Sequence, residues 1–407
     1  MALRVLMLAG SEICFNPRLV KAADALLAAG AEVTVVSPYL GKMDRAGYVE
    51  FNRRRHWRVL DFDISKTGPL SWLRWAWWSA VQRLAEKAWL KGRRICFPYA
   101  FSKTAIAGNS VSGRFDVVWI NLVDNLPVAL KLKAALPGAR IVYDSQEFFR
   151  GQYSTEESWR LRWVREAEKD ADANLDVVLA TTGVMRRRIV DELGVPEERV
   201  FRVRNVPYRP LDFDPPAEVD GKRPLRLIWH GMSIYYRNRR GLHVIVEAVG
   251  LSRSRPHLYV QGIEVVTEVA KLRQEAERFG IADRVHIVPP ADPDQIVKSL
   301  TGYDVGVAGE CPEEDNQRLT SSNKLFEWIG AGLATLMPDL PGLRETVDEY
   351  KTGLLYEPAS AASLAIAMDE LDADRNRLLE FRRNALTAAR NELHWEHDFA
   401  PVREVIF

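Results

Sequence analysis

Short apolar runs alternate with longer amphipathic stretches along most of the chain. Leu3–Leu8 is apolar at every position except Arg4, which is typical of a parallel strand covered on both faces. Pro17–Ala29 has helical periodicity, with proline in its first turn and Gly30 after its end. A further apolar run, Glu32–Ser37, follows. This order of strand, helix and strand predicts a parallel βαβ unit.

The same alternation fills two successive stretches of the chain. In the first stretch, the remaining strands are expected at Asp116–Ile120, Arg140–Tyr143, Val177–Ala180 and Val200–Val203. In the second, strands are expected at Leu225–Trp229, His257–Val260, Val285–Val288, Asp304–Ala308, Ala334–Met337 and Gly353–Tyr356. We therefore predict an α/β fold of two tandem Rossmann-like, doubly wound domains. Because open parallel sheets bind ligands beyond the carboxyl ends of their strands, we expect a site in a cleft between the two halves.

A proline-rich segment between Asn205 and Pro224 separates the two stretches and has no helical period. We predict a first domain over residues 1–205, with an aromatic insert near 70–103, and a linker over 206–224. A second domain over 225–390 and a terminal helical segment over 391–407 complete the chain.

Composition narrows the possible functions. The formal net charge of the 407 residues is +1, so the broad positive field of a nucleic-acid-binding protein is missing and we expect no nucleic-acid partner. The three cysteines, Cys14, Cys96 and Cys311, are far apart, which argues against disulfides and a structural zinc site. The N-terminus indicates a strand rather than a signal peptide, and no stretch has the length and apolarity of a bilayer span. We expect a cytoplasmic protein without a bound metal.

One segment of the second half combines several features of an anion site. Ser322 and Asn323 are N-cap residue types in front of an expected helix, and a helix N-terminus suits a diphosphate. Lys324, in the first turn, opposes the helix dipole unless an anion lies there. One turn on, Glu327 lies on the same face, and its carboxylate can accept two ribose hydroxyls. Each residue alone also fits a capped helix with surface charges; the combination favours the anion site.

This segment resembles the donor-binding motif of GT-B glycosyltransferases in the large retaining nucleotide-sugar family (glycosyl transferases group 1, family 4-like). In that family a helix start of the form Pro/Ser-Asn-Lys-x-x-Glu, followed by Ala-Gly and an apolar strand, holds the diphosphate and ribose. The matching residues are Ser322, Asn323, Lys324 and Glu327. A second glutamate often stands eight residues earlier, where this chain has Leu319. The resemblance implies the GT-B fold, with two domains facing each other across a cleft.

A basic loop at the start of the second domain is similar to the same family. Its members carry a Gly, a basic residue and then Lys-Gly, and the two cations neutralise the leaving diphosphate. Gly231, Arg237 and Arg240 take these places, and Arg239 is the alternative cation in the same loop. Arg240 stands where lysine is common, and arginine can bind phosphate through two hydrogen bonds. A solvent-exposed basic loop is the plainer interpretation.

The first domain also resembles this family at its acceptor side. After the first strand, Gly10 and Ser11 would face the cleft and Arg18 could meet an anion, although an ordinary βαβ unit explains this stretch nearly as well. A later strand ends in Asp144, followed by Gln146 and Glu147, and resembles the family's Tyr-Asp-x-His-Glu segment. Gln146 replaces the histidine that touches the transferred sugar, and it can hydrogen-bond but cannot titrate.

The resemblance covers most of the chain except residues 40–110. Trp395-Glu396 is similar to the family's terminal Trp-x segment, whose helix crosses back to the first domain. Residues 70–91, outside the resemblance, read as a helix with an apolar stripe of Leu73, Trp77, Ala80, Leu84 and Ala88. We expect this stripe to dock on the first domain. Trp75, Trp78 and Trp89 form a second face, for which burial is favoured over a peripheral membrane contact through residues 70–94, a partner or an acceptor wall.

We interpret the chain as an enzyme that transfers a sugar from a nucleoside diphosphate to an acceptor hydroxyl. The resemblance implies retention of configuration and no required metal or other cofactor. Arg240, Lys324 and the helix start at Ser322 would stabilise the departing diphosphate, with Gln146 beside the transferred sugar and Glu327 on the ribose. The acceptor is a glycan, a lipid-linked molecule or a small molecule. Base, sugar and acceptor stay open.

Two other functions fit parts of the same pattern. A sugar-nucleotide epimerase on this architecture needs titrating groups in the cleft, and Gln146 counts against it. A catalytically weak carbohydrate-binding or scaffold protein is suggested by Leu319 and Gln146. Binding of nucleoside diphosphates, and product analysis with donor alone, separate these possibilities.

Overall fold

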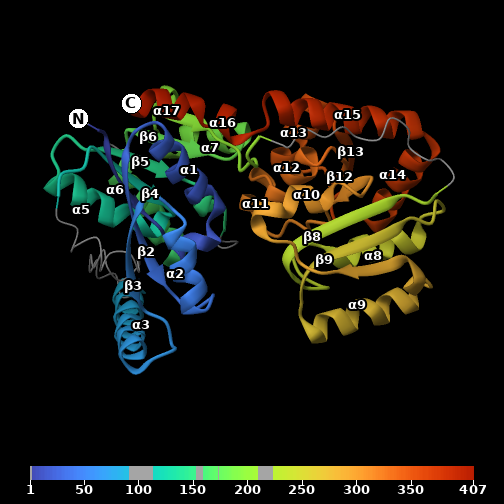
Figure 1. Ribbon diagram of the computed structural model, residues 1–407, viewed down its shortest axis with the longest axis horizontal. Coiled ribbons are helices and arrows are strands. Elements are labelled where there is room, and N and C mark those ends of the chain that lie inside the picture. Colours follow the sequence, from blue (N-terminus) through green and yellow to red (C-terminus); the bar gives the residue numbers. More distant parts are fainter. Residues whose placement is uncertain (1, 91–112, 153–158, 173, 210–222) are drawn as a thin grey trace. The chain divides into compact units, whose positions relative to one another are not determined.

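The computed structural model describes residues 2–90, 113–152, 159–172, 174–209 and 223–407 (Figure 1). It divides into two compact units. Unit 1 comprises Met1–Thr181, Met185–Val203 and Phe399–Phe407, and unit 2 comprises Thr182–Val184 and Arg204–Asp398. Most of the predicted linker, residues 210–222, lies outside the described residues.

Within its described residues, unit 1 is built on a parallel sheet of seven strands in the order β3-β2-β1-β4-β5-β6-β7. The strands are β1 (Arg4–Leu8), β2 (Glu32–Tyr39), β3 (Arg58–Asp63), β4 (Val117–Asn121), β5 (Arg140–Asp144), β6 (Val177–Ala180) and β7 (Val200–Arg202). The sequence predicts all of these except the edge strand β3. The chain begins in the middle of the sheet, because β1 pairs with both β2 and β4. Ligand crevices form where the strand order reverses in this way.

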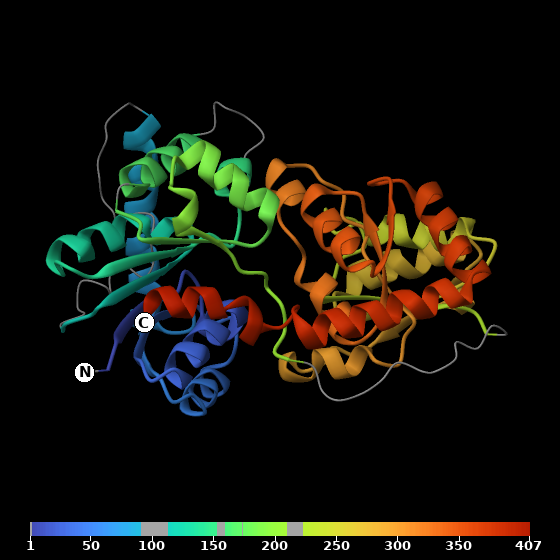
Figure 2. The same cartoon turned by 90° about the horizontal axis from the view of Figure 1, so that it is seen from above.

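The helices of unit 1 cover both faces of this sheet, seen from above in Figure 2. They are η1 (Ile13–Phe15), α1 (Pro17–Ala28), α2 (Arg45–Arg53), α3 (Pro69–Leu90), η3 (Val123–Asn125), α5 (Leu126–Ala135), η4 (Phe149–Gln152), α6 (Trp159–Asp172), α7 (Gly183–Leu193), η5 (Glu197–Arg199) and α17 (Ala400–Ile406). The last helix, α17, lies in unit 1, where the Arg140 guanidinium donates to the carbonyl of Val405 at 2.6 Å. The central strand β1 is fully buried from Val5 to Leu8, as its apolar run predicts.

The described part of unit 2 contains a parallel sheet of six strands in the order β10-β9-β8-β11-β12-β13. The strands are β8 (Arg226–Ile234), β9 (His257–Glu264), β10 (Val285–Val288), β11 (Val305–Val307), β12 (Ala334–Pro338) and β13 (Gly353–Tyr356). The sequence places all six. It predicts β8 too short, because the strand continues past a bulge between His230 and Ser233. This bulge lies at the carboxyl end of a central strand, where it redirects the chain toward the basic loop.

Helices pack on both faces of this second sheet. They are α8 (Leu242–Leu251), α9 (Val266–Arg278), η6 (Ala282–Arg284), η7 (Pro293–Gln295), α10 (Ile296–Leu300), α11 (Asp315–Leu319), α12 (Asn323–Gly330), α13 (Pro341–Tyr350), α14 (Ala361–Ala373), α15 (Arg375–Asn391) and α16 (Trp395–Asp398). The helices α8 and α14 pack against each other, and their apolar side chains join the buried core of the unit. Among the described helices of both units, none is long and apolar enough to cross a membrane.

The docking predicted for the apolar stripe of α3 is wrong. Leu73, Trp77 and Leu84 are 57%, 70% and 67% exposed. Ser71 is buried instead, and its hydroxyl accepts from the N–H of Gly68 at 3.1 Å and from the buried Ser65 hydroxyl at 3.4 Å. Trp75 is half-buried on that same side. The other stripe and face residues, Ala88, Trp78 and Trp89, have side chains outside the described set.

A buried carboxylate makes the stability of unit 1 depend on pH. Glu168 in α6 accepts from the Arg150 guanidinium at 2.6 Å and is 3% exposed. Burial raises the pKa of Glu168 from 4.5 to about 7, and Arg150 opposes that rise. Between these two values the folded protein binds more protons than the unfolded chain, so the free energy of unfolding falls as pH rises.

We expect Glu168→Gln to remove this dependence. Urea unfolding of both proteins at about pH 5 and about pH 8 measures it: the wild type should lose more stability than the variant over this interval. Parallel losses in the two proteins would show that Glu168 titrates at its ordinary pKa in the folded state.

Candidate functional site

The N-terminus of α12 is open at the carboxyl side of the second sheet. Ser322 is the N-cap residue in an extended conformation, and its side chain makes no capping hydrogen bond. Asn323 begins the helix, and its side-chain oxygen accepts from the Asn205 amide at 2.7 Å. The Leu325 N–H donates to the Ser322 carbonyl at 3.1 Å, and the positive end of the helix dipole at Asn323 and Lys324 favours an anion.

Lys324 lies just inside this helix start and is only 8% exposed. Its ammonium donates to Glu310 Oε1 at 3.3 Å and lies 5.7 Å from the centre of the Trp229 ring. Glu310 follows β11, so the lysine is held between a loop carboxylate and an aromatic face. A buried cation with one carboxylate neighbour retains two ammonium donors for another acceptor.

Glu327 is fixed by a histidine. Its Oε2 atom lies 2.6 Å from Nε2 of His230, at the carboxyl end of β8. The His230 ring is buried and packs edge-on against Trp328 at a centroid distance of 5.3 Å. Trp328 itself lies so close to β11 that a Cβ on Gly306 would be 2.2 Å from its ring. The Glu327 side chain stays 25% exposed, so its orientation is set while it remains accessible.

The basic loop is brought to the same place by a contact between two glycines. Gly241 has a φ of +64°, and a Cβ on it would lie 1.6 Å from the carbonyl oxygen of Gly309. On the same loop, the Arg240 Nη1 atom lies 3.3 Å from the Cβ position of Gly231. The same Cβ position is 3.0 Å from the outer edge of the Trp229 ring. Arg240 and Lys324 therefore both lie near Trp229.

Arg237 lies elsewhere in this loop. Like Arg240, it is exposed. Burial lowers the pKa of His243 in α8, and the nearby charge of Arg237 lowers this pKa further. The neighbouring Tyr236 N–H donates to Glu268 in α9 at 3.2 Å. Of the two predicted loop cations, Arg240 is therefore the one that the structure places beside Trp229.

In unit 1, two predicted acceptor-side residues form an internal ion pair. Arg18 and Asp144 are 1% and 0% exposed, and the Arg18 Nε atom lies 2.8 and 3.0 Å from the two carboxylate oxygens. The Arg18 guanidinium also donates to the carbonyl of Val203 at 2.6 Å. Burial raises the pKa of Asp144, and Arg18 opposes this. The expectation that Arg18 meets a substrate anion is thus corrected, because its charge is occupied by the end of β5.

An amide network lies next to this pair at the carboxyl ends of β4 and β5. Gln146 Nε2 donates to Asn16 Oδ1 at 3.3 Å, and Asn16 Nδ2 donates to Asn121 Oδ1 at 2.8 Å. Asn16 also caps α1 through the N–H of Leu19. Gln146 and Glu147 are half-buried, so both keep accessible surface at this sheet edge.

The loop after β1 is shaped by a residue that the sequence did not single out. Glu12 is fully buried, and its Oε1 atom accepts from the N–H groups of Leu40 and Lys42 at 2.6 and 3.2 Å. Gly10 and Ser11, just before it, are half-buried. A Cβ on Gly10 would lie 2.3 Å from the end of the Leu122 side chain, so a larger residue here would require Leu122 to shift.

The sequence comparisons now decide the family. Residues 224–374 match the family described as Glycosyl transferases group 1, and residues 16–206 match the Glycosyl transferase 4-like domain. The chain belongs to this glycosyltransferase family. No curated protein matches the glycosyltransferase at a significant level.

Solved structures resemble the whole glycosyltransferase at low identity. A glycosyltransferase from Rickettsia africae ESF-5 is 13% identical with a TM-score of 0.66, covering 100% of this chain and 98% of that one. Sucrose-phosphate synthase from Thermosynechococcus elongatus is 16% identical with a TM-score of 0.69, covering 99% and 98%. Anabaena Alr3699/HepE in complex with UDP-glucose is 15% identical with a TM-score of 0.64, covering 99% of each chain. These likenesses confirm the GT-B fold that the sequence predicts.

Proposed function

We propose that this enzyme transfers a sugar from a nucleoside-diphosphate sugar to an acceptor hydroxyl with retention of configuration, in the synthesis of a glycan or glycoconjugate. The observation that carries the proposal is that Arg240 and Lys324, in the first turn of α12, both lie close to Trp229. Support for the donor class comes from Anabaena Alr3699/HepE, whose structure holds UDP-glucose. We place the enzyme in the cytoplasm and expect no resident metal.

The residues of unit 2 have separate roles in this proposal. The departing diphosphate carries the charge that develops as the glycosidic bond to the leaving group breaks. Hydrogen-bond donors that are already positioned around this charge lower the activation barrier of the transfer. In this proposal the donors are Arg240, the Lys324 ammonium and the start of α12 at Ser322 and Asn323. Glu327 accepts the ribose hydroxyls, and His230 acts through it as a positioning residue by holding one carboxylate oxygen.

In unit 1, the half-buried side chains at the sheet edge would serve the sugar and the acceptor. Gln146 can donate or accept a hydrogen bond but cannot carry a proton to the reaction. Asp144 acts indirectly, because the strand end that precedes Gln146 is held by its pair with Arg18. Gly10, Ser11 and Glu147 complete the polar edge that we assign to the acceptor side.

Calorimetric titration with UDP, GDP and ADP tests the donor site. We expect one nucleoside diphosphate to bind, and we expect Glu327→Ala and Arg240→Ala each to weaken its binding by about 10- to 100-fold, since each removes a charged hydrogen-bonding partner. Arg253→Ala is the matched control, because this arginine is 91% exposed and pairs with Asp369 away from α12.

Three outcomes would favour another function. Failure of the wild type to bind any of the three nucleotides supports the carbohydrate-binding or scaffold interpretation. Equal weakening by Arg253→Ala would remove the assignment of Arg240. Formation of an epimeric sugar nucleotide from donor alone would support the epimerase.

A further inference from the structure

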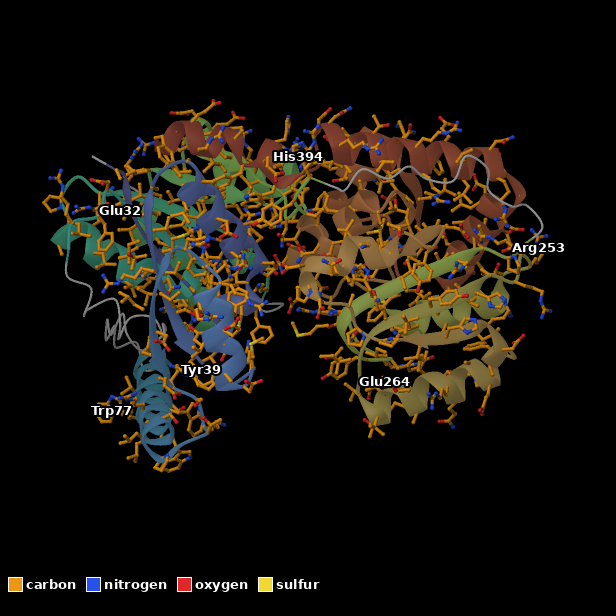
Figure 3. The ribbon with its side chains drawn as sticks, in the orientation of Figure 1. Glu32, Tyr39, Trp77, Arg253, Glu264 and His394 are labelled. Atoms are coloured by element: carbon orange, nitrogen blue, oxygen red, sulfur yellow. The ribbon has the colours of Figure 1, made fainter. Side chains whose placement is uncertain are left out.

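The helix α3 presents large apolar side chains to solvent. Leu70, Leu73, Trp77 and Leu84 are 72%, 57%, 70% and 67% exposed. Trp77 projects sideways from α3 in Figure 3. Contiguous exposed apolar surface of this kind on a soluble domain marks an interaction site.

These four residues form one continuous face. They recur at intervals of three, four and seven along the helix, which places them on the same side of it. Ala80, between Trp77 and Leu84, is exposed as well. At a rise of about 1.5 Å per residue, the face from Leu70 to Leu84 is roughly 20 Å long. The opposite side carries the buried Ser71 and the half-buried Trp75, so α3 is attached to unit 1 with this face outward.

The charge of the segment indicates what covers the face. Residues 66–94 contain seven basic residues and one acidic residue, and five of the twelve tryptophans of the chain lie at positions 72–89. In the described part, Arg74 is exposed and the Lys66 ammonium lies 3.9 Å from the centre of the Trp75 ring. Two copies of so basic a surface would repel each other, whereas an anionic surface attracts it. Tryptophan next to basic residues is the composition that suits the headgroup boundary of a bilayer.

We propose that α3 binds the surface of a bilayer containing anionic lipid, with Leu70, Leu73, Trp77 and Leu84 inserted among the acyl chains below the headgroups. The exposed side chains of Lys66 and Arg74 contact the anionic headgroups. The helix lies along the interface and does not span it, which agrees with the lack of a spanning helix among the described residues. This inference goes beyond sugar transfer and does not depend on it.

Flotation of the full chain with lipid vesicles tests the proposal. We compare phosphatidylcholine vesicles with vesicles that also contain phosphatidylglycerol, at low and at high salt. The wild type should float with the anionic vesicles at low salt, and high salt should weaken its binding. Leu73→Ser combined with Trp77→Ser should lower the partition coefficient at least about tenfold, because two inserted side chains are lost.

A second double variant controls for a general loss of apolar surface. Val266 and Ile366 in unit 2 are 82% and 68% exposed, and Val266→Ser with Ile366→Ser should float like the wild type. All four replaced side chains are exposed, so both variants should keep the thermal midpoint of the wild type. Sedimentation equilibrium without lipid shows whether a second copy occupies the face.

Each contrary result overturns the proposal. It fails if the wild type stays unbound to anionic vesicles, or if both double variants float equally well. It also fails if the wild type is a dimer that Leu73→Ser with Trp77→Ser converts to a monomer, since the occupant is then another copy of the chain.

Discussion

Gly241→Ala should destabilise unit 2 by more than about 4 kcal/mol, or prevent its folding. The added methyl group would lie 1.6 Å from the carbonyl oxygen of Gly309, which is backbone and cannot rotate away. The two loops that meet here lead from β8 into α8 and from β11 toward α11, so relief of the clash would separate segments packed on the central strands. Urea unfolding followed by circular dichroism, together with the soluble yield, measures the loss.

Gly280→Ala is the matched control for this variant. Gly280 has a φ of +65°, nearly the same as Gly241, but no atom lies within 4 Å of its Cβ position. The control therefore carries the backbone strain alone, about 1–2 kcal/mol. If the two variants lose the same stability, the close approach of Gly309 contributes nothing and the strain of positive φ explains both.

Asp398→Asn should lower the free energy of unfolding by about 3–5 kcal/mol. Asp398 accepts hydrogen bonds from both Nε and Nη2 of the Arg204 guanidinium, and the two side chains are 5% and 4% exposed. Its carboxylate also accepts from the Arg204 N–H at 2.6 Å. Asparagine removes the negative charge and leaves the buried positive charge of Arg204 without a counter-charge. The free-energy cost of that unpaired charge is larger than the net stabilisation that the ion pair provides. Urea unfolding at neutral pH measures the difference.

A solvent-exposed ion pair in the same unit provides the comparison. Glu370 and Arg377 form a pair in which the side chains are 46% and 41% exposed. Glu370→Gln should change the free energy of unfolding by no more than about 1 kcal/mol. A similar small change for Asp398→Asn would mean that water or a nearby group satisfies Arg204 after the substitution.

Much of the fold follows from sequence periodicity. Buried parallel strands need apolar residues on both faces, so runs such as Leu3–Leu8 and Ala334–Met337 predict their strands within a residue or two. The edge strand β3 escapes this rule. Its sequence, RVLDFD, is half polar, and its residues are at most partly buried. The pattern of polar and apolar residues in such an edge strand is therefore similar to that of a loop.

The candidate site was predictable where a motif fixes the local geometry and not where tertiary contacts do. The start of α12 lies where Ser322, Asn323 and Lys324 indicate, although the Ser322 side chain makes no capping hydrogen bond. The partner of Glu327 is His230, 97 positions earlier, and only the strand order brings them together. A histidine at the carboxyl end of a central strand was the available signal.

Arg18 illustrates the opposite error. A basic residue at a helix start, after the first strand, suggests an anion site when read along the chain. Its carboxylate partner is 126 positions away in β5, and no local pattern reveals that pairing. The outward face of α3 was missed for a related reason: periodicity shows that an apolar stripe exists but not which side of the helix the rest of the domain covers.

The pairing of Lys324 with Glu310 has a consequence for which anions the site would bind. A ligand with one weak negative charge must compete against a carboxylate already in place and gains little by displacing it. An anion that also contacts Arg240 is attracted by two cations, so it can displace Glu310 from Lys324. Glu310 would therefore make the site selective for extended, multiply charged leaving groups over small inorganic anions.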